Sequence, residues 1–373
     1  MKIVIASDSF KGSMTSLEVA TAASAGVVEV YPESEIVTVN VADGGEGTVE
    51  AIVDALDGEI VKVNVSDPLG REIESYYGIA GETAILEMAA ASGLPLLKAE
   101  ERNPWLTSTY GTGQMIMDAI AHGCRHFLVG IGGSATNDAG IGMLQAMGYR
   151  FYDSDDQLIV NGCGGVLGQI VRIDDSLVSE AVKNSVFMVA CDVDTPFCGP
   201  EGAAPVFAPQ KGADVEMVRR LDAGMASLAK VIAEKYAIDV VPLAGAGAAG
   251  GMGGAFRAFL GATLKRGIDM VLDAIDFDTT IQGADLVITG EGKVDFQTAK
   301  GKTAAGVLNR AKKQYIPVVA IGGCVEMCDS LVQMGFAGIY PILEEKVPLE
   351  VAMQRDFAMS NVTKTVARIL LSR

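Results

Sequence analysis

A lysine stands in a polar turn near the start of the chain, between an apolar run and the first residues of a predicted helix. The turn contains Ser9, Lys11, Gly12 and Ser13. The unpaired N–H groups and positive dipole end of a helix N-terminus favour an anion, and a lysine adds a mobile cation at the same place. Phosphate is therefore the ligand that we expect at this turn. The alternative is a plain connection between a strand and a helix, with a solvated lysine.

Acidic side chains follow the next predicted strand. In "EIVTVNVADGGEG" the apolar run leads to Asp43 and Glu46. Mg²⁺ usually takes one or two carboxylates in a protein and completes its shell with phosphate oxygens and water. These two residues are candidate ligands of a hydrated Mg²⁺, and a polar turn without a metal is the alternative.

Further apolar runs also end in polar side chains. The segment "HFLVGIGGSATNDAG" carries a group that either binds a ligand or caps a helix, namely Ser134, Thr136, Asn137 and Asp138. Single charged candidates in other segments are Asp8, Asp192, Lys211, Glu291, Lys293 and Asp295. The lysines are candidate cations for an anionic ligand, and the carboxylates are candidates for proton transfer. Solvated surface lysines and structural turns are the alternatives.

Strands and helices alternate along most of the chain, which favours parallel sheets and the α/β class. Thr15 and Glu18 fit a capping box, and the apolar spacing after them predicts a helix that runs to about Tyr31 and stops at Pro32. In open α/β sheets, ligands bind outside the carboxyl ends of the strands. The polar turns fall at those ends, so several of them together predict a binding site.

The alternation of strands and helices is interrupted between about residues 61 and 87, where three strand patterns are joined by the turns at 67–70 and 80–82. Antiparallel hairpins explain this pattern. We therefore predict two α/β domains: a discontinuous Rossmann-like domain with a parallel sheet, formed by residues 1–61 and 283–373, and an inserted mixed-sheet domain, formed by residues 62–282. The active site is expected in the cleft between them.

Composition excludes several classes of protein. The chain has 373 residues, of which 49% are hydrophobic and 20% charged, so it can bury a large core. A formal net charge of −18 opposes general binding to nucleic acid or to anionic membranes. The N-terminal residues run straight into a strand without the regions of a signal peptide, so the cytoplasm is the expected location. The oligomeric state stays open.

Residues 240–256 are rich in Gly and Ala, which contribute too little apolar area for membrane insertion, and we interpret them as a loop that exposes its backbone. The six cysteines contain no C-x-x-C pair, which argues against a disulfide framework or a thiolate zinc site. His122 and His126 are the only histidines, so histidine-based catalysis is not expected.

The chain matches neither of two common nucleotide-binding motifs. "FQTAKGKT" has the Gly-Lys-Thr end of a phosphate-binding loop, but Phe296 replaces its first glycine and the strand ends too early. A nicotinamide dehydrogenase needs G-x-G-x-x-G between a strand and a helix, with an acidic residue about twenty positions further on. No run meets all these conditions. A catalytically silent sensor of sugar acids stays an alternative.

Taken in order, six blocks resemble the signature motifs of the bacterial type I glycerate kinases over essentially the whole chain: "DSFKGS", "ADGGEG", "GIGGSATNDAG", "FAPQKGA", "GAGAAGGMGG" and "ITGEGKVDFQTAKGKT". The resemblance implies transfer of the γ-phosphoryl group of ATP to D-glycerate with Mg²⁺ in a two-domain α/β protein. It also implies 2-phosphoglycerate as the product, with 3-phosphoglycerate as the alternative. Ala139, Ala304 and the segment 194–197 depart from the usual pattern, which affects loop geometry and removes no titratable group of the motifs.

Phosphoryl transfer needs in-line positioning, cations that neutralise the phosphates, and a carboxylate that orients the attacking hydroxyl. On this interpretation the turn with Lys11 binds phosphate, and Asp192 orients the hydroxyl of the substrate. Asp8, Asp138, Glu291 and Asp295 stay alternatives for that last role. Lys211 and Lys293 are candidate cations for the substrate carboxylate or for ATP.

Overall fold

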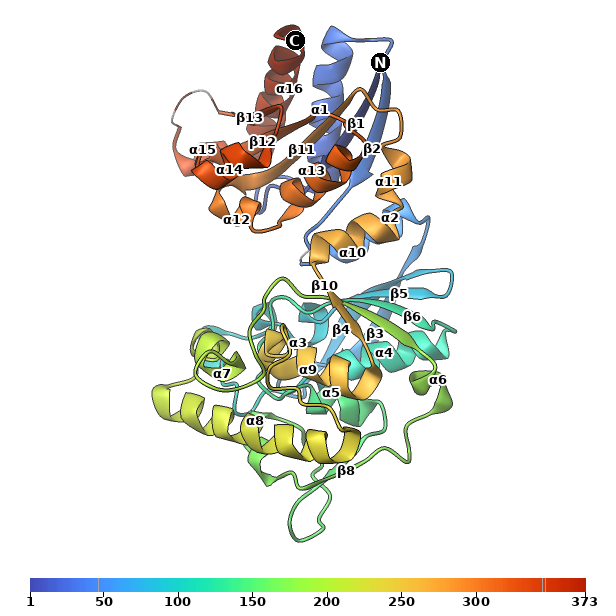
Figure 1. Cartoon of the computed structure of the whole chain (residues 1–373), viewed down its shortest axis with the longest axis vertical. Helices are drawn as coiled ribbons and strands as arrows, with labels where there is room; N and C mark the ends of the chain where they lie inside the picture. The colour runs from blue at the N-terminus through green and yellow to red at the C-terminus, as the bar shows by residue number, and fades with distance from the viewer. Residues whose placement is uncertain (46, 344, 346) are drawn as a thin grey trace. The chain divides into compact units, whose positions relative to one another are not determined.

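The structure is a computed structural model that describes all residues except 46, 344 and 346 (Figure 1). The chain forms two compact units, each of which is described by itself. Unit 1 comprises Met1–Asp43, Glu50–Leu56 and Ile268–Arg373, and unit 2 comprises Gly44–Val49 and Asp57–Gly267. Unit 1 has a parallel sheet and unit 2 a mixed sheet, which confirms the predicted fold class. Domain boundaries at 61/62 and 282/283 stay a prediction.

The sheet of unit 1 has the strand order β13-β12-β11-β1-β2, and every neighbouring pair is parallel. Its strands are β1 (Lys2–Ser7), β2 (Glu35–Asn40), β11 (Leu286–Val294), β12 (Val318–Val325) and β13 (Gly338–Pro341). On one side of the sheet β1 is followed by β2, and on the other side β11 is followed by β12 and then β13. The sheet therefore reverses between β1 and β11, and ligands of open α/β sheets bind at the carboxyl ends of strands at such a switch point.

The helices of unit 1 cover both faces of this sheet. They are α1 (Ser16–Val30), α2 (Thr48–Ala55, from Glu50 onward), α10 (Gly267–Ala274, from Ile268 onward), α11 (Phe277–Thr280), α12 (Phe296–Ala299), α13 (Thr303–Lys313), α14 (Asp329–Met334), α15 (Leu349–Ala352) and α16 (Arg355–Leu371). The predicted capping box of α1 is confirmed: Thr15 Oγ1 accepts the N–H of Glu18, and Glu18 accepts the N–H of Thr15.

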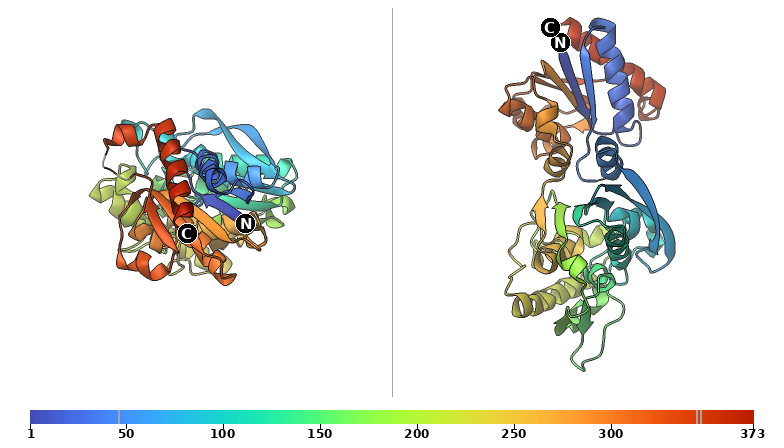
Figure 2. Two further views of the ribbon diagram at one scale, coloured as in Figure 1. Left: turned by 90° about the horizontal axis from the view of Figure 1, so that it is seen from above. Right: turned by 90° about the vertical axis from the view of Figure 1, so that its right-hand side faces the viewer.

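The first and last helices, α1 and α16, pack side by side over one face of the sheet (Figure 2). Gly26 permits this approach, because a Cβ there would lie 2.4 Å from the carbonyl oxygen of Thr363. Their apolar sides enclose a core with β1, β11 and β12 that includes Ile3, Ile288 and Val362. Both ends of the chain thus stabilise the same sheet.

The main sheet of unit 2 has the order β10-β9-β6-β5-β4-β3. The strands β3 (Glu59–Ser66), β4 (Glu72–Ala80) and β5 (Thr83–Glu87) form two antiparallel pairs, which confirms the predicted hairpins. Parallel pairs continue from β5 through β6 (His126–Gly130), β9 (Val186–Ala190) and β10 (Thr263–Lys265). A separate antiparallel pair is formed by β7 (Arg150–Tyr152) and β8 (Arg172–Asp174).

Helices and short 3₁₀ turns complete unit 2. The α-helices are α3 (Ala89–Ser92), α4 (Tyr110–Ala121), α5 (Ile141–Ala146), α6 (Glu180–Lys183), α7 (Ala203–Phe207), α8 (Val215–Tyr236) and α9 (Ala248–Leu260). The 3₁₀ turns are η1 (Leu94–Leu96), η2 (Ala99–Glu101), η3 (Gly164–Gln169) and η4 (Pro209–Lys211). None of the helices within the described residues is long and apolar enough to cross a membrane.

Helix α9 corrects the prediction of a loop across residues 240–256. The helix begins at Ala248 and includes a kink, where Ala249, Gly250 and Gly251 adopt left-handed backbone angles. A Cβ at Gly250 would lie 2.2 Å from the carbonyl oxygen of Thr136, so only glycine fits against that strand-to-helix loop. Burial of the glycine-rich face outweighs the low helix propensity of glycine.

Candidate active site

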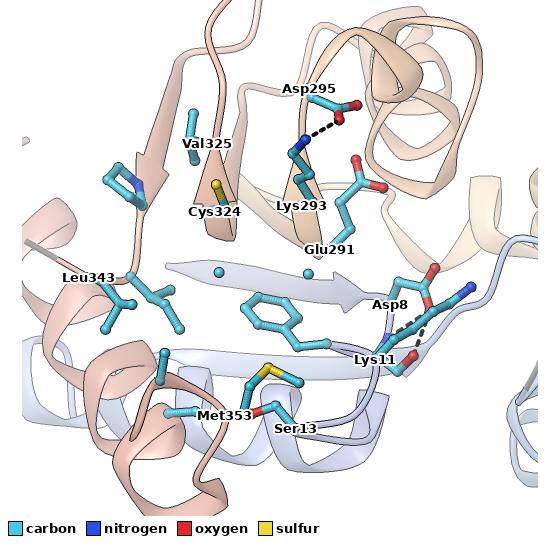
Figure 3. A pocket seen from close by; sticks show the side chains of 18 of the residues that line it. Asp8, Lys11, Ser13, Glu291, Lys293, Asp295, Cys324, Val325, Leu343 and Met353 are labelled. Atoms are coloured by element: carbon cyan, nitrogen blue, oxygen red, sulfur yellow. Dashed lines mark hydrogen bonds and ion pairs between the residues drawn. The ribbon is translucent and has the colours of Figure 1, made fainter. Parts of the chain in front are cut away.

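A pocket of about 810 Å³ opens in unit 1 at the carboxyl ends of β1 and β11 (Figure 3). It lies at the switch point of the sheet, where the strand order predicts a ligand. The residues predicted from the sequence that line it are Asp8, Ser9, Lys11, Ser13, Asp43, Glu291, Lys293 and Asp295. Glu46, the second predicted metal ligand, lies outside the described residues.

The turn after β1 is fixed by its own backbone. Phe10 and Met14 form a bridge, and the N–H of Ser13 donates to the carbonyl of Phe10 at 2.8 Å. Gly12 closes the turn in the left-handed region, at a φ of +77°. Lys11 is exposed beside the pocket. Helix α1 begins only at Ser16 and is capped by its own residues, so we attribute the positive character of the turn chiefly to Lys11.

Asp8 is buried directly after β1 and is held from two sides. Its Oδ2 accepts from Thr303 Oγ1 at 2.8 Å, and its Oδ1 accepts from the N–H of Ser9 at 2.7 Å. Burial and the charge of Asp43 raise the pKa of the Asp8 carboxyl, against the opposing effect of these hydrogen bonds. Thr303 thus orients a carboxylate that comes from the other end of the chain.

Glu291 lies on β11 on the other side of the switch point. It accepts a hydrogen bond from Thr298 Oγ1 and is 6% exposed. Burial raises its pKa to about 7, and the charges of Asp8 and Asp43 add to the rise, while Thr298 and Lys302 oppose it. Three carboxylates therefore repel one another in the pocket, and a cation or a proton would relieve that repulsion.

Lys293 and Asp295 line the same pocket but are already paired. The ammonium of Lys293 lies 3.1 Å from Asp295 Oδ2 and 3.0 Å from Glu326 Oε1. Asp295 also caps α12, accepting the N–H of Gln297 at 2.8 Å. Although desolvation opposes it, this hydrogen bond and Lys293 lower the pKa of Asp295.

The second predicted group of site residues lies in unit 2. Asp138 is fully buried, and its carboxylate accepts from the N–H groups of Thr109, Gly140 and Gly142 and from Thr109 Oγ1. Burial raises its pKa, although these donors oppose the change. These bonds tie the start of α4 to the start of α5, which favours the helix-capping interpretation for Asp138.

Lys211 is 1% exposed, which corrects the alternative of a solvated surface lysine. Its ammonium donates to Ser134 Oγ at 2.7 Å and to the carbonyl of Thr136 at 2.6 Å. Desolvation lowers its pKa to about 7, against the attraction of Asp138. Thr136 Oγ1 and Asn137 Oδ1 are buried and have no hydrogen-bond partner among the residues that the structure describes.

Asp192 follows β9 and is exposed, and its Oδ1 accepts the N–H of Gly267 at 2.9 Å. The prediction that it leaves a strand end is thus confirmed, but the same bond fixes the connection after β10. Among the described residues, no group of three or more His, Cys, Asp or Glu side chains could hold a metal ion by itself.

Three residues outside the predicted set act on the site: Lys302 lines the pocket, and Thr298 and Thr303 donate to the carboxylates of Glu291 and Asp8. All three belong to "FQTAKGKT", a segment that does not fit the pattern of a phosphate-binding loop. Their hydroxyls and charge act instead on Glu291 and Asp8. The sequence feature that indicates these residues is the high density of hydroxyl and lysine side chains in that segment.

A parallel sheet with acidic and basic side chains at its switch point is typical of α/β proteins that bind small charged ligands. A sequence model described as "Glycerate kinase family" matches residues 3–372. The chain therefore belongs to the glycerate kinase family, which confirms the predicted resemblance and the predicted class of kinase.

Relatives of similar length support this assignment. A glycerate kinase of Haemophilus influenzae is 45% identical over 99% of both chains. The Glycerate 2-kinase of Escherichia coli is 44% identical over 98% of both chains. A crystal structure from Salmonella typhimurium LT2, assigned to glycerate kinase 2, has a TM-score of 0.91 at 44% identity and covers 100% of this chain and 98% of its own.

Proposed function

We propose that this protein transfers the γ-phosphoryl group of ATP to D-glycerate and releases 2-phosphoglycerate. The observation that carries the proposal is the unit 1 pocket, where Lys11 stands beside buried carboxylates at the switch point of a parallel sheet. Similarity to the Escherichia coli Glycerate 2-kinase supports the 2-hydroxyl as the acceptor. Transfer to the 3-hydroxyl is the alternative.

The turn after β1 is the proposed phosphate site. Lys11 supplies a mobile cation, Gly12 supplies an N–H group, and Ser9 and Ser13 supply hydroxyls on a backbone that is already fixed. A preorganised donor set stabilises the charge of the transferring group without reorganisation during the reaction. Lys302 and Lys293 line the same pocket and add positive charge.

Magnesium is proposed as the cofactor that accompanies ATP. Within the part of the chain that the structure describes, no group of three or more His, Cys, Asp or Glu side chains could hold a metal ion by itself, so Mg²⁺ would bind here with phosphate oxygens and water in its shell. Asp43, with Glu46 as the second proposed ligand, would hold the ion beside the phosphates. Burial, with a further contribution from neighbouring carboxylates, raises the pKa values of Asp8 and Glu291, and a divalent cation would relieve the repulsion between these carboxylates. When bound, the metal neutralises phosphate charge.

Glycerate is proposed to bind through the polar group of unit 2. Ser134, Thr136, Asn137 and Lys211 gather donors and acceptors that suit hydroxyls and a carboxylate. Asp192 is the proposed residue that orients the attacking hydroxyl, since it is exposed after a strand end. Asp138 suits that role less well, because its oxygens already accept four hydrogen bonds.

A small organic acid is thus the proposed partner, and neither nucleic acid nor a membrane is. We also propose the cytoplasm as its location. Product analysis tests the function: purified protein is incubated with Mg·ATP and D-glycerate, and the product is examined by ³¹P NMR. Besides the resonances of ATP and ADP, we expect one new resonance at the chemical shift of authentic 2-phosphoglycerate. Formation of 3-phosphoglycerate alone would contradict the assignment of the 2-hydroxyl as the acceptor. The absence of any phosphorylated glycerate would contradict the proposed activity.

A further inference from the structure

The unit 1 pocket has an apolar end that the phosphate chemistry does not use. It is lined by Val325 at the end of β12, Pro341 and Leu343 at the end of β13, and Leu349 and Met353 around α15. In Figure 3, Leu343 and Val325 lie away from Asp8 and Lys11. Glu345, in the same loop, is a charged exception. One pocket thus joins a charged end to an apolar end.

The two ends meet at the turn after β1. A Cβ on Gly12 would lie 2.9 Å from the terminal methyl of Met353, so this thioether side chain packs directly against the turn that carries Lys11. Phe10 lines the pocket from the same turn. A ligand held at Lys11 by its anionic part would therefore extend over Met353.

Neither glycerate nor a bare triphosphate explains the apolar end. Both are strongly polar, and apolar walls offer them no hydrogen bonds in exchange for lost water. A purine ring has two apolar faces, which suit aliphatic and thioether side chains. The volume of about 810 Å³ also falls within the range of pockets that enclose a ligand of nucleotide size.

We infer that the apolar end of this pocket, formed by Val325, Leu343, Leu349 and Met353, binds the purine ring of ATP while the triphosphate extends to Lys11. This inference rests on the proposed function, because it assigns a place to the nucleotide of that reaction. Shape and dispersion contacts, more than polar side chains, hold the base there.

A tryptophan at Ala352 tests the assignment by filling the apolar end. Ala352 lines the pocket from α15, whereas Glu350, on the same helix, is exposed and does not line it. Calorimetric titration should show that Ala352→Trp weakens ADP binding at least tenfold and changes tripolyphosphate binding less than threefold. The control Glu350→Trp should bind ADP within twofold of wild type. Normal ADP binding by a folded Ala352→Trp protein would overturn the inference.

Thiol labelling tests the same point in the wild-type protein, so it does not depend on the folding of a variant. Cys324 is exposed and lines the pocket, while Cys328, four positions on, is half-buried and does not line it. ADP or adenosine should slow the reaction of Cys324 with N-ethylmaleimide at least fivefold, as measured by mass spectrometry of peptides. Cys328 should react at an unchanged rate. Equal labelling of Cys324 with and without saturating ADP would contradict the assignment.

The two proposals fail in distinguishable ways. If the protein phosphorylates D-glycerate while ADP leaves Cys324 unprotected and Ala352→Trp binds ADP normally, only the placement of the base is wrong. If ADP protects Cys324 and Ala352→Trp weakens its binding, the placement holds even where no glycerate is phosphorylated, and only the proposed function is wrong.

Discussion

Lys11 differs from Lys211 and Lys293 because it is exposed and its ammonium has no hydrogen-bond or ion-pair partner among the described residues. Lys211 is buried and donates to Ser134 and Thr136, and Lys293 is paired with Asp295 and Glu326. Lys11 is exposed on a turn whose backbone is held by hydrogen bonds between Phe10 and Met14. Its ammonium is thus mobile, while its anchoring point is rigid. That combination suits a cation that follows a group during transfer.

Replacement of Lys11 should affect turnover far more than folding. In Lys11→Met the side chain keeps a similar length and loses its charge, so stabilisation of the transferring phosphate is lost. We expect kcat to fall by roughly 100- to 1,000-fold, which is about 3–4 kcal/mol of barrier, with KM for glycerate changed only a few-fold. Steady-state kinetics measure both. Lys11→Arg should recover part of kcat, and wild-type turnover in Lys11→Met would refute the role.

Glu291 should make the ligand-free protein less stable as the pH rises. Its pKa is about 7 in the folded protein against an ordinary value of 4.5, so the folded state holds the proton more tightly. The penalty for ionising Glu291 is absent below about pH 4.5, grows between the two pKa values, and is complete above about pH 7. This difference between the two pKa values corresponds to a loss of roughly 3 kcal/mol in the free energy of unfolding at high pH.

Glu291→Gln removes that ionisation and keeps an acceptor for Thr298. Urea unfolding without nucleotide or metal should show a gain of up to roughly 3 kcal/mol at pH 8 and almost none at pH 4.5. A stability difference between variant and wild type that is the same at both pH values would show that Glu291 is not the titrating group.

At the scale of elements, the sequence predicted helix ends and hairpins correctly where residues close in sequence determine the local structure. The capping box at Thr15 and Glu18 is present, and both hairpins of β3, β4 and β5 form where turn residues were found. Helix α9 was missed, because its glycines indicate a loop by propensity. Nine of its residues are buried against other parts of unit 2, and a single sequence does not show such packing.

Position 250, in the kink of α9, should accept no residue other than glycine. Gly250 and Gly261 both have left-handed angles, with φ of +67° and +62°. A Cβ at Gly250 would meet Thr136 O at 2.2 Å, whereas a Cβ at Gly261 has no neighbour within 4 Å. Gly261→Ala should therefore cost about 1 kcal/mol from backbone strain, and Gly250→Ala roughly 3 kcal/mol or more. Denaturant unfolding gives both values, and equal losses would contradict the packing argument.

At the scale of the whole molecule, the candidate pocket depends on contacts between distant parts of the chain. Asp8 and Thr303 are 295 positions apart, yet their side chains form a hydrogen bond. The sequence predicted which strand ends carry chemistry, because polar turns after apolar runs are local. It did not predict that Thr303 orients Asp8, since that pairing is set by the order of the strands in the sheet. The contact of Thr298 with Glu291, only seven positions away, depends on the geometry of the turn between β11 and α12.

Loss of packing on α16 should therefore loosen β1, at the other end of the chain. Val362 is fully buried among residues of α1 and the sheet, while Lys364 is exposed on the same helix. Val362→Ala should destabilise unit 1 by about 2 kcal/mol and speed hydrogen exchange in β1, because both share one core. Lys364→Ala should stay within about 0.5 kcal/mol of wild type. Unchanged exchange in β1 of Val362→Ala would argue against a shared core.

Release of ADP by the purified protein tests the central claim most directly. With Mg·ATP, the proposed function predicts ADP release that depends on D-glycerate, is much weaker with L-lactate or glycerol, and falls by roughly 100-fold or more in Lys11→Met. A coupled assay follows it continuously, with and without the acceptor. ADP release at the same rate without D-glycerate, or turnover of glycerate that requires NAD(H) in place of ATP, would contradict the assignment.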